Sequence, residues 1–137
     1  MVDDEGVDLV FHRRGGTATL AVQVKSRGSD TSVVRRGRFE ANVRGSVFEV
    51  RQNLYMLFVV VDRPTARLGP IWFIPSDEFD TLASTTGRGM RKISANTGPA
   101  ASDRWLPYRM DFEALPRAIL EVLSGLESDE SGGVVRT

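Results

Sequence analysis

The chain has 137 residues, 41% of them hydrophobic and 26% charged, and its formal net charge is zero. These values are typical of one globular domain and exclude the disordered and fibrous classes. The absence of cysteine and the presence of a single histidine, His12, exclude disulfides, zinc–thiolate sites and multi-histidine metal sites, so any metal ion must be bound by oxygen.

Two strands joined by a tight turn are predicted near the start of the chain. Strand-like runs at Val7–Arg13 and Thr17–Arg27 flank the pair Gly15-Gly16. Two adjacent glycines favour a two-residue type I′ turn, because both of its central residues need φ > 0. We therefore expect a β-hairpin here.

The next segments predict a helix and then a buried strand. Apolar residues recur at helical spacing between Arg38 and Asn53, which favours a helix, although Gly45 and the β-branched residues leave a strand open. Leu54–Val61 is a continuous apolar run ended by a turn, typical of a strand buried on both faces. Helices or loops should cover it.

The second half of the chain alternates short elements. Pro70–Ser76 predicts a strand, and Ser76 is placed to cap a short helix that follows it. Met90–Ser94 predicts a short strand, and the apolar stripe from Phe112 to Leu126 predicts a closing helix. We expect one domain over residues 1–126 and a polar, frayed tail over residues 127–137.

The predicted turn fixes how the two hairpin strands face each other. With Gly15 and Gly16 as the loop, residues pair when their numbers sum to 31, and apolar residues then share one face. That face should be the core side, since a shift by one residue would expose it. The opposite face, turned from the interior, would carry Asp8, Gln23 and Lys25, with Asp8 and Gln23 roughly 5 Å apart.

Asp8, Gln23 and Lys25 form a candidate site for phosphate chemistry. A carboxylate and an amide oxygen are hard ligands suited to Mg²⁺. Lysine is a compact cation that can orient an attacking water, lose its proton or stabilise a pentacovalent phosphate. An alternative interpretation stays open, in which the three side chains are the solvated face of an ordinary hairpin.

The motif resembles that of the PD-(D/E)XK nuclease superfamily, which has the restriction-endonuclease-like fold. Its signature is G-x-D followed after about 10 to 20 residues by (E/Q)-x-K, and the chain reads GVD at Gly6–Asp8 and QVK at Gln23–Lys25. Trp72–Phe79, WFIPSDEF, is similar to a later segment of small bacterial members. The resemblance implies an α/β fold with a central mixed sheet of about four to five strands, an N-terminal β-hairpin and flanking helices.

The resemblance also implies an activity and a role for each motif residue. The activity is a Mg²⁺-dependent DNA endonuclease, with Mn²⁺ as a substitute and no small-molecule cofactor. Asp8 would be the metal-bridging carboxylate, Gln23 the second ligand and the main-chain carbonyl of Val24 a further ligand. Lys25 would be the water-orienting base or charge stabiliser. Glutamine where glutamate is commoner implies weaker metal binding.

The resemblance leaves one part of the family pattern unmatched. The motif lies close to the start of the chain, so the family's opening helix, with the glutamate often carried on it, would be missing. Asp3, Asp4 or Glu5 would be the substitutes for that glutamate, another chain would supply it, or activity would be lost.

A basic segment that begins within the predicted hairpin indicates a nucleic-acid partner. Residues 12–51 hold nine Lys or Arg against three acids, a net charge of +6. Phosphate contacts with DNA are predicted for five arginines of this segment: Arg27, Arg35, Arg36, Arg38 and Arg44. The alternative is that these arginines are simply solvated.

Two other functions fit the same sequence. One is a catalytically inactive nucleic-acid-binding domain of the same fold, whose site no longer retains metal. The other is a protein-interaction module, or a homodimer, that uses the buried strands and exposed aromatic residues.

The opening residues and the apolar segments indicate a cytoplasmic protein. MVDDEGVD is acidic where a signal peptide is basic and then apolar, so we expect no leader. The longest apolar run, Leu54–Val61, is about a third of a membrane span, which predicts no membrane partner. The lack of cysteine suits a reducing compartment.

Overall fold

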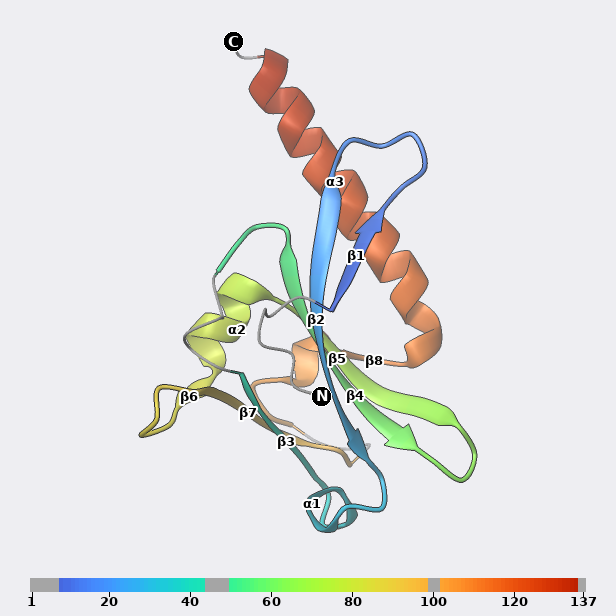
Figure 1. Cartoon of the computed structure of the whole chain (residues 1–137), viewed down its shortest axis with the longest axis vertical. Coiled ribbons are helices and arrows are strands. Elements are labelled where there is room, and N and C mark those ends of the chain that lie inside the picture. The colour runs from blue at the N-terminus through green and yellow to red at the C-terminus, as the bar shows by residue number, and fades with distance from the viewer. Residues whose placement is uncertain (1–7, 44–49, 99–101, 136–137) are drawn as a thin grey trace.

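A computed structural model describes residues 8–43, 50–98 and 102–135, and within these ranges the chain forms two β-sheets with flanking helices (Figure 1). The predicted α/β class is confirmed. The strands are β1 (Leu9–His12), β2 (Thr19–Gly28), β3 (Arg38–Val43), β4 (Leu54–Asp62), β5 (Arg67–Pro75), β6 (Ser84–Thr85), β7 (Arg91–Asn96) and β8 (Arg109–Met110). The α-helices are α1 (Ser32–Arg35), α2 (Ser76–Leu82) and α3 (Leu115–Val135), and 3₁₀ turns lie at Leu106–Tyr108 and Phe112–Ala114.

The larger sheet is mixed, as predicted, and has the strand order β1-β2-β4-β5-β8. β2 and β4 run parallel, whereas the other neighbouring pairs run antiparallel. The chain that connects β2 to β4 includes α1 and β3, because a parallel pair needs a long crossover.

The predicted buried strand is β4, which lies at the centre of this sheet. Alternate residues of β4 enter two separate cores, one on each face of the sheet. On one face the core lies under α3, which packs diagonally across the sheet in Figure 1. Its buried residues are Leu20, Val22, Leu57, Val59, Ile71, Phe73, Leu115 and Leu123.

The other face of the larger sheet is covered by a second sheet, of order β3-β7-β6, and by α2. The buried aromatic residues gather here. Phe39 of β3 lies against Phe58 and Trp72 of the larger sheet, with ring centroids 5.9 and 5.2 Å apart. Both faces of the larger sheet are therefore covered at its central strand, β4.

The second sheet contradicts the helix that we favoured for Arg38–Asn53. Residues 38–43 form β3, which pairs antiparallel with β7. Phe39, Ala41 and Val43 alternate toward the core, and this period of two, rather than the helical spacing, is the relevant pattern. Residues 44–49, which include Val47, lie outside the described residues.

The closing helix begins later and extends further than its apolar stripe predicts. α3 runs from Leu115 to Val135, and therefore includes most of the segment predicted as a frayed tail. Arg13, in the loop after β1, forms an ion pair with Glu127 of this helix. Among the helices that the structure describes, none is long and apolar enough to cross a membrane.

Candidate functional site

The hairpin has the predicted register and a different turn. Leu9 lies opposite Val22 and His12 opposite Thr19, so paired numbers sum to 31 as expected. The two-residue Gly15-Gly16 turn is wrong, because pairing ends at His12 and Thr19 and residues 13–18 form the loop. Gly15 alone has a positive φ, of 77°, so a type I′ turn does not form. The longer loop is symmetric about the same point, which preserves the register.

Asp8 is anchored to the main chain of β2. Its N–H donates to the carbonyl of Val22 at 3.0 Å, and its Oδ2 accepts the N–H of Val24 at 2.6 Å. A short bond from an amide to a carboxylate is charge-assisted and fixes the position of the carboxylate. Asp8 therefore extends β1 by one residue and places its side chain beside the residue between Gln23 and Lys25.

The carbonyl of Val24, a predicted metal ligand, faces the same edge as Asp8. The Val22 carbonyl and the Val24 N–H both point from β2 toward Asp8. Since the N–H and C=O of one strand residue point the same way, and residues two apart repeat this direction, the Val24 carbonyl points there as well. Two predicted oxygen ligands thus share one edge of β2.

Gln23 is buried, which corrects the prediction that its face is turned from the interior. Its exposed fraction is 1%, and it lies opposite Met56, which belongs to the core between the larger sheet and the second sheet. Its Oε1 atom accepts no hydrogen bond from the part of the chain that the structure describes. A buried carbonyl oxygen without a hydrogen bond lowers the stability of the folded protein by about 1–3 kcal/mol. The amide oxygen is therefore suited to receive a cation or another donor.

Lys25 lies on the same face of β2 as Gln23, two residues further along the strand. Gln23 is opposite Met56 of β4, and Lys25 is opposite Phe58. Lys25 is half-buried, and within residues 8–43, 50–98 and 102–129 it pairs with no acid. A half-buried lysine that pairs with no acid of the described ranges is a suitable partner for a phosphate.

The predicted phosphate-binding arginines divide into two groups. Arg35 and Arg36 are exposed, in α1 and at its C-terminal cap. Arg27 donates to the Glu40 carbonyl at 3.1 Å, and Arg38 donates to the Ser94 hydroxyl at 2.6 Å. The latter two hold β3 in place, so they have fewer donors left for a ligand. Arg44 lies outside the described residues.

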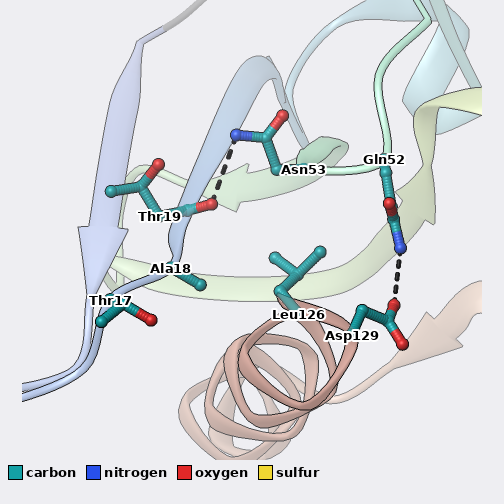
Figure 2. Close-up of a pocket in the computed structure, with 7 residues that line it drawn as sticks. All are labelled: Thr17, Ala18, Thr19, Gln52, Asn53, Leu126 and Asp129. Atoms are coloured by element: carbon teal, nitrogen blue, oxygen red, sulfur yellow. Dashed lines mark hydrogen bonds between the residues drawn. The ribbon is translucent and has the colours of Figure 1, made fainter. Parts of the chain in front are cut away.

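Two of the cavities lined by described residues lie away from these side chains. One, of about 370 Å³, opens between the start of β2, the residues before β4 and the end of α3 (Figure 2). Gln52 and Asp129 point toward one another across it, and Gln52 Nε2 donates a hydrogen bond to Asp129 Oδ2 at 2.7 Å. Another, of about 1060 Å³, lies between the β4–β5 turn and β8. Sequence reasoning missed both, and the polar pair Gln52-Asn53 before an apolar strand was the available signal for the first.

The donors near Asp8 suit a hard cation with few protein ligands. One carboxylate, one amide oxygen and one main-chain carbonyl are all oxygen atoms, which Mg²⁺ prefers. In the described ranges, no group of three or more His, Cys, Asp or Glu side chains is placed to bind a metal ion. The proposed ligands differ from such a group, because two of the three, the Gln23 amide oxygen and the Val24 carbonyl, are neutral.

No family model matches this chain, and neither a curated protein nor a solved structure shows significant similarity to it. A functional assignment must therefore come from its own residues and their geometry.

Proposed function

We propose that this chain is a metal-dependent DNA endonuclease of the PD-(D/E)XK type, with Mg²⁺ as its ion and Mn²⁺ as a substitute. Two observations carry the proposal: Gln23 Oε1 is buried and accepts no hydrogen bond from the described residues, and the Asp8 carboxylate is fixed on the next residue of β2, Val24. A neutral amide buried only for packing would keep its oxygen hydrogen-bonded. An oxygen reserved for a cation accounts for both features.

Each residue of the cluster has a distinct part in the proposed reaction. Asp8, Gln23 and the Val24 carbonyl hold the ion at the edge of β2. When bound, the ion supplies a Lewis acid that polarises a phosphoryl oxygen and neutralises developing charge. Lys25 orients the attacking water or stabilises the negative charge of the transition state. The mixed sheet with helices on its faces is compatible with the restriction-endonuclease-like fold.

A catalytically inactive nucleic-acid-binding domain is the second candidate. The observation that favours it is the single carboxylate among the predicted ligands, since a neutral glutamine attracts a divalent cation less than a glutamate. This candidate retains DNA affinity and lacks metal-dependent cleavage. Metal dependence therefore distinguishes the two.

The test is cleavage of supercoiled plasmid and of single-stranded DNA with Mg²⁺ or Mn²⁺. Asp8→Asn is more informative than Asp8→Ala, because the asparagine oxygen can still accept the Val24 N–H while the charge is lost. Lys25→Ala has a matched control in Lys92→Ala, the chain's other lysine, which pairs with Glu40 at 3.5 Å on the second sheet.

We expect Asp8→Asn and Lys25→Ala to lower the cleavage rate on the order of 100-fold or more, and Lys92→Ala to leave it unchanged. Equal activity in all four proteins would mean a contaminating nuclease and would end the proposal. No cleavage by the wild type, with DNA binding intact, would support the inactive domain instead.

A further inference from the structure

The carboxyl ends of β2 and β4 lie side by side, because these strands are parallel neighbours. The Ser29 N–H donates to the Val61 carbonyl at 2.8 Å, and the Ser29 hydroxyl donates to Asp62 at 3.0 Å. In Figure 1 the helix α1, which follows β2, and the turn after β4 both lie at this lower end of the molecule. The two segments form one end surface.

Four arginines lie on the segments that form this end, which we call the basic end: Arg35, Arg36, Arg63 and Arg67. Arg67 lies opposite Asp62 at the start of β5. The carboxylates here are Asp30 and Asp62, and Asp62 already accepts hydrogen bonds from Ser29 and Thr65. The described residues of the basic end therefore carry an excess of two positive charges.

Arg63 is folded over the end of β2. Its Nε lies 3.4 Å from the position that a Cβ on Gly28 would occupy, which is an ordinary contact distance, whereas Asp30 Oδ1 lies 2.5 Å from that position. Its contact with Asp30 is 4.0 Å long, and its side chain is 71% exposed. An ion pair of this length and exposure contributes little, so the guanidinium can turn to an external anion.

The distance from the candidate site to the basic end matches a few nucleotides. Lys25 and Gly28 are three residues apart on β2, which corresponds to roughly 10 Å at about 3.3 Å per residue. A DNA strand advances about 3.4 Å per nucleotide along its axis. A phosphate held at the end of β2 would thus be about three nucleotides from one held at Lys25.

We propose that the basic end binds the phosphate backbone of the DNA substrate about three nucleotides to one side of the bond that the Asp8–Gln23–Lys25 cluster would cleave. This inference rests on the proposed function and adds a direction to it, along β2 toward α1. The substrate is therefore a polynucleotide that continues past the scissile bond on that side, and a dinucleotide is a poor substrate.

The test measures the salt dependence of binding to a fluorescent DNA duplex in Ca²⁺, so that cleavage does not interfere. Two double variants each remove two positive charges from the basic end: Arg63→Gln with Arg67→Gln, and Arg35→Gln with Arg36→Gln. A third, Arg88→Gln with Arg117→Gln, removes two positive charges elsewhere and is the control. The control arginines are exposed on the β6–β7 turn and on α3. Net charge is thus matched.

We expect each basic-end variant to weaken binding about tenfold and to reduce the slope of log affinity against log salt by about 2. The control should change neither. Equal losses in all three variants would overturn the inference, as would unchanged binding in the basic-end variants.

Cleavage by the same proteins in Mg²⁺ separates this inference from the proposed function. A wild type that does not cleave, but whose binding depends on Arg63 and Arg67, would refute the hydrolysis and support the surface. If both basic-end variants still cleave DNA in a metal-dependent way and bind it with unchanged affinity, the proposed role of the basic end is refuted, whereas the proposed nuclease activity stands.

Discussion

The Ser76 hydroxyl bonds to both main-chain polar groups of Arg51. Its Oγ accepts the Arg51 N–H at 3.0 Å and donates to the Arg51 carbonyl at 2.7 Å. Ser76 is fully buried and is the first residue of α2, whereas Pro75 holds the capping position without a side-chain bond. The predicted capping role of Ser76 is therefore wrong, and its hydroxyl joins the start of α2 to the residues before β4.

Replacement of this serine should destabilise the fold. Ser76→Ala removes the partner of two main-chain groups of Arg51, so we expect a loss of about 1–3 kcal/mol in the free energy of unfolding. Urea denaturation measures it, and Ser84→Ala, at an exposed position of β6, is the control. A loss below about 0.5 kcal/mol would show that water replaces the hydroxyl at no cost.

Both tyrosines of the chain should ionise at unusually high pH. The Tyr108 hydroxyl donates to Glu78 at 2.6 Å, and this bond, with burial and the charges of Glu78 and Asp77, raises the pKa of Tyr108 to about 12. Burial, followed by the same two charges, raises the pKa of Tyr55. A raised pKa in the folded state means that the Tyr108–Glu78 bond stabilises the protein up to about pH 10 and that this contribution is lost as the pH rises through about 12.

Ultraviolet titration of the phenolates measures this effect. We expect no transition near the ordinary tyrosine pKa of about 10 in the wild type, and a lower pKa for Tyr108 in Glu78→Ala. Glu113→Ala, which removes an exposed carboxylate from another segment, should not change the titration. Transitions near pH 10 in both wild type and Glu78→Ala would contradict the assignment.

The sequence predicted the strands whose signals are local. The register of β1 and β2 is the predicted one, because the loop of residues 13–18 is centred on the same point as the Gly15-Gly16 pair, and the alternation of Phe11, Leu20 and Val22 fixes which face is apolar. The turn was missed because the preference of a Gly-Gly pair was applied to a loop of six residues. The apolar run of β4 correctly predicted a strand buried on both faces.

The environment of the candidate site depends on contacts that no local pattern encodes. Gln23 is buried beside Met56, on the face of the larger sheet where the second sheet of β3, β7 and β6 closes the core. The alternation of Phe39, Ala41 and Val43 was the available signal, and valines at helical spacing obscured it. The sequence predicted that Asp8 lies opposite Gln23. It did not predict that the Asp8 carboxylate accepts the N–H of Val24, because a bond from a side chain to the main chain leaves no pattern in the sequence.

The most direct test of the central claim is the effect of Mn²⁺ on the nuclear magnetic resonance signals of Gln23 and Val24. A paramagnetic ion broadens the signals of nuclei close to it. We predict that substoichiometric Mn²⁺ broadens the Gln23 side-chain amide and the Val24 amide in the wild type, and that Asp8→Asn abolishes the broadening while the fold persists. Broadening that is equal in Asp8→Asn, or absent at these two residues in the wild type, would contradict a metal site at the edge of β2.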